Sequence, residues 1–422
     1  MKERSGKQMR VWSLMEQGFH SLANFAMAIF LARELPKESW GAFSLGFALL
    51  LFAQGFQRAL ISIPVATMAH DLDLLSGSLT FWRRLQGRIT LCATGALTLA
   101  AGLWFLCGGE RSVAEALAVS ALLAPGYFSL EFWRRVLIQC RDIRGAAAVA
   151  GGLLVSVALL MAALSFATAG ALVAAAGLCA CTLLAGAACR LRVGSLLPAP
   201  REKLDWSDQV ARLGRWSIMS HIAFSGYNTA IQVMLSLVAG PAAMGVFAAV
   251  RNIIQPVNTL IGAVDNLDKP RAARAFAAGG FPELFSSLWR TMSTLALVGG
   301  LYLAACAAAG GFLVQIAYQG RYGHSWNEVW LWCLIALAMM AAQPLESGLY
   351  VAQRSDALFL NRAISALIGL GAAAVAIPAW GVQGALLGLA LGWLSTAFLA
   401  LLQLKLMARD SEQASRLEGV QG

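Results

Sequence analysis

The chain has 422 residues, of which 59% are hydrophobic and 13% are charged, and its mean hydropathy is +0.66. Soluble globular proteins are about 25% charged, so this composition excludes a soluble protein and indicates one that is embedded in lipid. The formal net charge of +10 would also fit a nucleic-acid-binding protein, so the placement of the basic residues has to decide between the two classes.

Apolar runs long enough to cross a membrane occur twelve times along the chain. A helix needs about 20 largely apolar residues for this purpose. The first run carries Glu16, Gln17, His20 and Asn24, which a cleavable signal peptide would not, so we expect it to remain as the first helix. The predicted runs are 11–33, 40–62, 89–108, 113–133, 145–166, 169–190, 216–238, 245–265, 291–314, 328–352, 358–378 and 384–406.

The lysines and arginines alternate with these runs. When the gaps between runs are numbered along the chain, the odd gaps with the run ends beside them hold 4 basic residues, whereas the even gaps, the two tails and the run ends beside them hold 26. Because basic residues are retained on the cytoplasmic side, this pattern predicts a multi-pass protein of the bacterial inner (cytoplasmic) membrane with both termini in the cytoplasm. It also accounts for the net charge without nucleic acid as a partner. The two remaining arginines, Arg58 and Arg251, fall inside predicted helices.

An internal repeat relates the first two predicted helices to the seventh and eighth. A shift of 204 residues aligns Asn24 with Asn228 and Gly41 with Gly245, among nine identities in 32 positions. An even number of helices per repeat gives both repeats the same orientation, as in some secondary transporters. We therefore expect an all-α integral membrane fold of about 12 transmembrane helices, in two six-helix bundles related by a pseudo-two-fold axis along the membrane normal. The expected parts are an N-terminal bundle over 1–190, a cytoplasmic linker over 191–215, a C-terminal bundle over 216–406 and a cytoplasmic tail over 407–422.

Polar side chains gather in the first two predicted helices of each repeat. Such groups are costly in hydrocarbon, so they are expected to face a water-filled cavity; the alternative is hydrogen bonding between helices across a dry interface. A guanidinium group in a membrane needs an anion or water, so Arg58 and Arg251 predict an anionic cargo such as a phosphate or diphosphate. The predicted cavity residues are Arg58, Arg251, Gln57, Asn24, Asn228 and Gln255.

Acidic and histidine side chains are the candidates for coupling transport to a proton or cation gradient. Salt bridges or helix-end contacts are the alternative interpretation of each. The candidates are Glu16, His20, His221, Asp265, Glu131 and Glu346. No nucleotide-binding loop, metal-ligand spacing or nucleophile motif stands out, so we expect a protein that is not an enzyme, is not driven by ATP, and needs no cofactor and no metal site.

The segment Phe30–Gly46, FLARELPKESWGAFSLG, carries Ala-Arg-x-Leu, a short turn and then Gly-x-Phe-Ser. With the helix count and the duplication, it resembles the polysaccharide-exporting branch of the MOP superfamily, the Wzx-type flippases of lipid-linked oligosaccharides. The resemblance implies a V-shaped cavity between two bundles, and alternating access that carries an undecaprenyl-diphosphate-linked glycan to the periplasmic leaflet for surface polysaccharide synthesis. It implies membrane lipid, and polymerase and chain-length proteins of the pathway, as partners. Relatives often carry an acidic residue where this chain has Asn228 and Thr229, which argues against ion coupling at that position.

Two other functions are consistent with the sequence. An ion-coupled exporter of drugs or small cations, as in the MATE branch of the same superfamily, would need acidic rather than basic residues deep in the cavity. A non-transporting scaffold of a polysaccharide synthesis complex would bind its synthesis partners without using the cavity residues at all. The basic and amide side chains at the predicted mid-membrane positions favour the flippase over the exporter.

Overall fold

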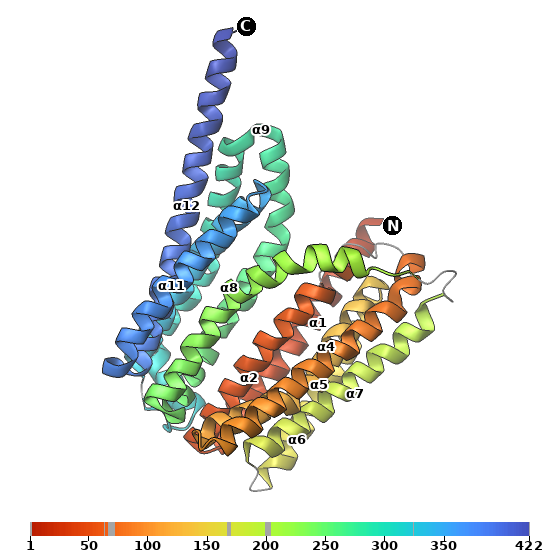
Figure 1. Cartoon of the computed structure of the whole chain (residues 1–422), viewed down its shortest axis with the longest axis vertical. Coiled ribbons are helices and arrows are strands. Elements are labelled where there is room, and N and C mark those ends of the chain that lie inside the picture. Colours follow the sequence, from red (N-terminus) through yellow and green to blue (C-terminus); the bar gives the residue numbers. More distant parts are fainter. Residues whose placement is uncertain are drawn as a thin grey trace. The chain divides into compact units, whose positions relative to one another are not determined.

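The computed structural model describes residues 2–421 apart from 63, 66–71, 167–169, 199–203 and 324, and all the described secondary structure is helical (Figure 1). Side chains at 2–10, 209, 211–217, 220, 224, 263, 265–267, 355, 412 and 414–421 lie outside the described part. The helices are α1 (Lys2–Glu34), α2 (Lys37–Gln57), the π-helix η1 (Arg58–Ser62), α4 (Leu72–Leu106), α5 (Arg111–Gln139), α6 (Ile143–Ser165), α7 (Ala171–Leu196), α8 (Ser207–Ala239), α9 (Pro241–Ala317), α10 (Trp326–Val351), α11 (Ser355–Trp380) and α12 (Val382–Gln421).

Helix α9 consists of two helices joined at a glycine pair. Gly279 has φ −149° and ψ 20°, and Gly280 has φ 64° and ψ −146°, a positive φ that glycine adopts without strain. Pro282 follows at the start of the second helix, where its missing N–H is not needed. With η1 counted as the end of α2 and α9 counted as two, the described residues form twelve helices that match the twelve predicted runs, so the predicted fold class is confirmed.

Ten helical segments in the described part of the chain are long and apolar enough to cross a membrane. Helix α1 and the first part of α9 fall below that limit, because they carry many of the polar side chains noted above. Helix α4 is an example of the other helices, because it carries large apolar side chains on its exposed face. Leu91, Leu99 and Leu106 are 75%, 68% and 81% exposed. A continuous exposed apolar face of this kind is stable in lipid rather than in water.

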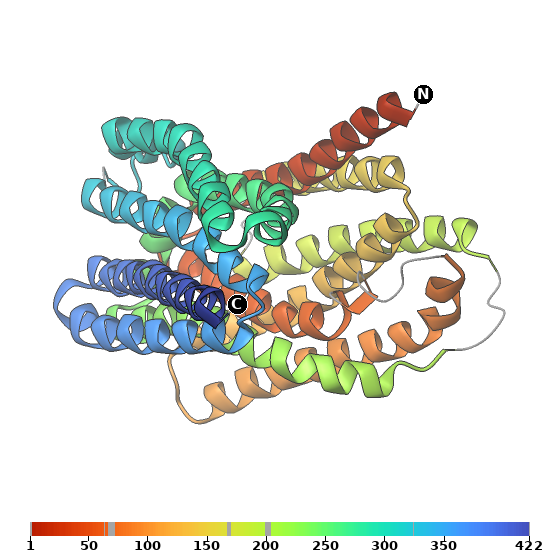
Figure 2. The same cartoon turned by 90° about the horizontal axis from the view of Figure 1, so that it is seen from above.

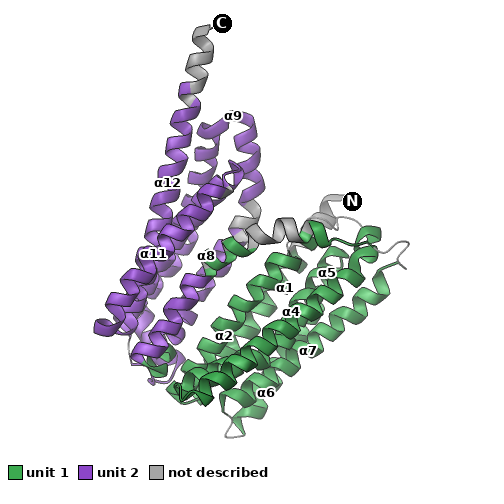
Figure 3. Cartoon of the chain, in the orientation of Figure 1, with its two compact units in different colours: residues 1–225, 240–245 green, residues 226–239, 246–422 purple. Residues whose placement is uncertain are grey.

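The chain divides into two compact units (Figure 3). Unit 1 comprises residues 1–225 and 240–245, and unit 2 comprises 226–239 and 246–422. Within unit 1, α5 packs against α2, α4 and α7, while α1 packs against α6. Within unit 2, α12 packs against α10 and α11, and the two blue helices α11 and α12 lie side by side in Figures 1 and 2.

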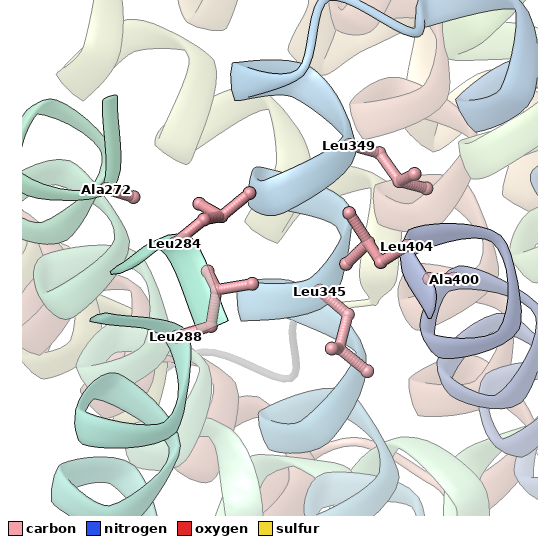
Figure 4. Packing of buried hydrophobic residues seen from close by; sticks show 7 residues of the cluster. All are labelled: Ala272, Leu284, Leu288, Leu345, Leu349, Ala400 and Leu404. Carbon is pink, nitrogen blue, oxygen red and sulfur yellow. The ribbon is translucent and has the colours of Figure 1, made fainter. Parts of the chain in front are cut away.

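An aliphatic core joins helices of unit 2 (Figure 4). It takes side chains from both arms of α9, from α10 and from α12. Its buried members are Ala272, Leu284, Leu288, Leu345, Leu349, Ala400 and Leu404. The segment of α10 in this core also carries Glu346, so the core fixes the backbone that holds this carboxylate.

Glycines spaced four residues apart on α12 bring it close to α11. The spacing of Gly384, Gly388 and Gly392 predicts close helix packing. A Cβ atom at Gly388 would lie 2.6 Å from the Ala373 Cβ and 2.8 Å from the Gly369 carbonyl oxygen. The prediction of close packing is therefore confirmed.

Valine at Gly388 is expected to force α11 and α12 apart and to lower the free energy of unfolding by about 1–3 kcal/mol, the usual cost of overpacking. Gly371→Val on α11 is the matched control, because a Cβ at Gly371 would meet no atom within 4 Å. Unfolding of the two purified variants in detergent compares their stabilities. Equal stability of the two variants would contradict the packing argument.

Candidate functional site

A network of charged side chains in unit 1 links α1, η1 and α5. Arg134 donates from Nη1 to Glu16 Oε1 at 2.7 Å and from Nη2 to Glu131 Oε2 at 2.9 Å. Arg135 Nε donates to Glu131 Oε1 at 3.1 Å, and Arg58 Nε lies 3.5 Å from the same oxygen. Glu16 and Glu131 are each 5% exposed. We call these five residues the unit 1 charge cluster.

The cluster carries an excess of positive charge. Glu131 and its two following partners, Arg134 and Arg135, are spaced three and four residues apart, which places them on one helix face. Two carboxylates face three guanidinium groups, so one positive charge is not neutralised within the cluster. The Arg58 side chain is 50% exposed, and it presents this excess charge to its surroundings.

The backbone around Arg58 departs from the α-helix. Helix α2 changes to the π-helix η1 at Arg58, and single π-helical turns are often found at functional sites. Arg58 Nη2 donates to Gln54 Oε1 at 3.1 Å, and Gln54 Nε2 donates to the Tyr127 carbonyl at 3.3 Å. Helix α5 therefore positions the Arg58 guanidinium both directly, through Glu131, and indirectly, through Gln54.

Two other predicted cavity residues bond to α5. Gln57 has no exposed surface, and its Nε2 donates to the Phe128 carbonyl and to Gln86 Oε1, both at 2.8 Å. Asn24 Oδ1 accepts a hydrogen bond from the Tyr127 hydroxyl at 3.2 Å. These bonds join helices in the way that the alternative interpretation of the polar residues describes. Their role as cavity residues stays a prediction.

The two predicted coupling histidines have different surroundings. His20 is half-buried on α1, one turn after Glu16. The Nε2 atom of His221 lies 2.8 Å from the Phe52 carbonyl oxygen, and its ring stacks on Phe52 with the centroids 5.4 Å apart. A Cβ at Gly55 would overlap this ring, so the absence of a side chain there makes room for His221 against α2.

In unit 2, Arg251 bonds to a neutral amide. Its Nη1 donates to Gln232 Oε1 at 3.2 Å, and Gln232 Nε2 donates to the Asn228 carbonyl at 3.1 Å. Among the side chains that the structure describes, no carboxylate pairs with Arg251. Gln255 is exposed one turn further along α9 and accepts a hydrogen bond from Asn258. The side chain of Asp265 lies outside the described residues.

Glu346 on α10 pairs with Arg362 on α11. Arg362 donates from Nε to Oε1 at 2.8 Å and from Nη2 to Oε2 at 3.1 Å, and Glu346 is 3% exposed. Glu131 and Glu346, which lie in similar sequence settings, are thus both buried and bonded to arginine. Their part in ion coupling, and that of Glu16, stays a prediction.

The arginine partners of these carboxylates were not among the predicted site residues. Arg134, Arg135 and Arg362 entered the sequence analysis only as positive charges at the cytoplasmic ends of helices. The spacing of Glu131 with Arg134 and Arg135 was a usable signal for an ion pair. No local pattern joined Arg362 to Glu346, because they lie on different helices.

A small cavity in unit 2 lies outside the predicted site. Its lining includes Asp268, Thr291 and Ser347, and its volume is about 10 Å³. Thr291 Oγ1 donates to Asp268 Oδ2 at 2.5 Å. A cavity of about this volume is at the lower limit for one water molecule, so it is no binding site for a lipid-linked cargo.

No family model and no curated protein matches the sequence significantly. Solved structures match it over nearly its whole length. An inward-facing multidrug resistance MATE family transporter of the MOP superfamily aligns with a TM-score of 0.72 at 14% identity, over 96% of this chain and 99% of the other.

Two further structures match at a TM-score of 0.62 and 14% identity, each over 94% of both chains. One is an outward-facing multidrug resistance MATE family transporter. The other is a MOP superfamily transporter from Pyrococcus furiosus, whose binding pocket has a reversed polarity that suggests a different function. At this identity the similarity is one of fold, and the chain has the twelve-helix, two-bundle membrane fold of the MOP superfamily transporters.

Proposed function

We propose that the chain is a flippase that moves an undecaprenyl-diphosphate-linked sugar unit across the bacterial inner membrane for surface polysaccharide synthesis. The observation that carries the proposal is a guanidinium charge in each unit that no carboxylate among the described side chains fully neutralises. Arg58 is half exposed in a cluster with one excess positive charge, and Arg251 bonds to the amide of Gln232. A diphosphate is an anion that guanidinium groups bind with paired, charge-assisted hydrogen bonds.

The similar structures support transport by alternating access, because they include inward-facing and outward-facing forms of MATE family transporters. The reversed pocket polarity of the Pyrococcus furiosus protein supports the view that side chains in the pocket, rather than the fold, decide the cargo. For this chain the side chains that decide are basic. We expect the glycan itself to be recognised by the neutral amides near the two arginines, such as Gln255.

Cargo binding and ion coupling can be joined through Glu131. Its contact with Arg58, at 3.5 Å, is longer than its contacts with Arg134 and Arg135. A diphosphate that binds Arg58 would therefore remove one guanidinium group from Glu131. The ionised form of the Glu131 carboxylate would then be less stabilised. Protonation of the charge cluster would then accompany cargo binding, which is the linkage that a proton-coupled carrier requires.

The proposal is tested by translocation of a fluorescent undecaprenyl-diphosphate oligosaccharide in proteoliposomes. Arg58→Gln and Arg251→Gln are each expected to reduce the rate about tenfold or more, because a hydrogen bond to a charged group contributes about 1.5–3 kcal/mol. Arg354→Gln is the control, since Arg354 is exposed between α10 and α11 and pairs with Asp356. Wild-type rates in both test variants would contradict the cargo site.

A MATE-like exporter of drugs, coupled to a cation, is the second candidate, and the fold of the similar structures favours it. It predicts that a strain without the protein becomes sensitive to drugs and keeps its surface polysaccharide. If the protein is a flippase, the strain without it loses its surface polysaccharide and keeps its drug resistance. Failure of the folded wild-type protein to move the lipid-linked oligosaccharide, with and without a proton gradient, would favour the exporter.

A further inference from the structure

Two arginines that the proposed function does not use lie against one tryptophan in unit 1. Trp133 is on α5, and Arg83 on α4 and Arg190 on α7 approach its ring. The guanidinium carbons lie 5.9 Å and 5.7 Å from the ring centroid. Trp133 is 9% exposed, whereas both arginines are exposed. Helices α4 and α7 both pack against α5 (Figure 1), so three helices build this site from residues far apart in the sequence.

The site concentrates positive charge. The two distances to one ring place the guanidinium groups of Arg83 and Arg190 within about 12 Å of each other. Cation–π contacts hold the two groups in place but do not neutralise them. Neither arginine has a carboxylate partner among the described side chains. An anion seated beside Trp133 would relieve the repulsion between the two groups.

The site lies at one depth of the membrane. The apolar run 89–106 of α4 begins six residues after Arg83, which is about 9 Å along a helix. The apolar run 171–189 of α7 ends directly before Arg190. Trp133 ends the apolar part of α5, which runs in the same direction as α7 and opposite to α4. Trp133 and Arg190 therefore lie at the same edge of the hydrocarbon. The Arg83 backbone lies further out, and its long side chain reaches back to the Trp133 ring at this edge.

We propose that Arg83, Trp133 and Arg190 bind the phosphate head group of an anionic phospholipid. The two guanidinium groups would take the phosphodiester oxygens, and the indole would occupy the interfacial position that tryptophan favours in membranes. Exposed leucines on the neighbouring turns, Leu91 at 75% and Leu183 at 42%, provide the apolar surface for the acyl chains. The basic residues at this edge make it the predicted cytoplasmic side, where anionic lipids are attracted to basic pockets between helices.

The test uses the full chain, stripped of lipid in mild detergent and titrated with phosphatidylglycerol or phosphatidylcholine while native mass spectrometry counts the bound lipid. Arg83→Gln/Arg190→Gln is compared with Arg84→Gln/Arg88→Gln. The control pair removes the same charge from exposed positions on α4 that make no cation–π contact with Trp133. We expect the wild type and the control to prefer phosphatidylglycerol, and the site variant to bind it about tenfold more weakly.

The other outcomes overturn the proposal. Equal losses in the two double variants would mean that the surface charge acts without a defined site, and no loss in either would mean that no lipid binds there. Displacement of phosphatidylglycerol by millimolar inorganic phosphate would identify a free-phosphate site instead. Trp133→Leu keeps both charges and tests the ring separately, with binding expected to fall between the wild type and the site variant.

Discussion

Glutamine in place of Glu131 is expected to lower the free energy of unfolding by about 3–5 kcal/mol, the cost of breaking a buried ion pair. The carboxylate bonds Arg134 and Arg135 and lies 3.5 Å from Arg58. Its removal leaves Glu16 alone against three guanidinium groups. The Arg134 side chain is only 17% exposed, so water cannot compensate for the lost charge. Unfolding of the purified variant in detergent measures the effect.

Arg135→Gln is the matched control for this prediction. Arg135 belongs to the same cluster, but its side chain is 45% exposed and its pair with Glu131 lies within one helix. Exposed pairs of this kind contribute about 1 kcal/mol or less. If the Arg135 variant lost as much stability as the Glu131 variant, burial of the ion pair would not be the cause.

Alanine at Gly41 is expected to lower the free energy of unfolding by about 3 kcal/mol, the upper end of the usual cost of overpacking. The added Cβ would overlap the Pro241 carbonyl oxygen and lie 2.7 Å from its carbon. Both are backbone atoms, so no side-chain movement can make room. The start of α9 would have to leave α2, and the hydrogen bond from Trp40 Nε1 to the Gly245 carbonyl, 3.1 Å long, would break.

Gly95→Ala on α4 is the matched control, because it makes the same glycine-to-alanine change at a position without a close backbone neighbour. A Cβ at Gly95 meets no atom within 4 Å, and alanine favours a helix over glycine by about 1 kcal/mol. This variant should therefore unfold at a higher denaturant concentration than the wild type, and Gly41→Ala at a lower one. A shift of both variants in the same direction would contradict the assignment of the Gly41 effect to the contact with Pro241.

The number and type of helices could be predicted from the sequence, because each crossing of the hydrocarbon leaves an apolar run of a fixed minimum length. The helix ends could not. Helix α4 begins at Leu72, well before the predicted run at 89, and α8 begins at Ser207, before the run at 216. A helix can continue beyond the hydrocarbon into water, where its residues need not be apolar. The end of an apolar run therefore does not mark the end of the helix. The two helices of α9 likewise continue far into the predicted gap between 265 and 291 and meet at Gly279 and Gly280.

The ion pairs of the candidate site could be predicted from the sequence only where both residues of a pair lie on the same helix. The polar residues and the two arginines of the helix interiors could be identified because such groups are rare in apolar runs. The pairing of Glu16 with Arg134 spans 118 residues, and no local pattern indicates it. The sequence therefore identified Glu16, Glu131 and Arg58 inside predicted helices, while the structure of unit 1 pairs the two carboxylates with arginines and leaves the unit 1 charge cluster with one excess positive charge.

The contact at Gly41 has the form of a homodimer interface within one polypeptide. Gly41 packs against Pro241 and Gly245 packs against Lys37, and each second-repeat residue follows its first-repeat counterpart by 204 positions. This exchange of equivalent partners defines an isologous interface between identical subunits. It is the contact expected of an ancestral six-helix protein that paired with its own copy before gene duplication and fusion joined the two. In such an ancestor a single glycine position would form both halves of the contact. In this chain Gly41 and Gly245 are separate positions, and both must remain glycine for the contact to persist.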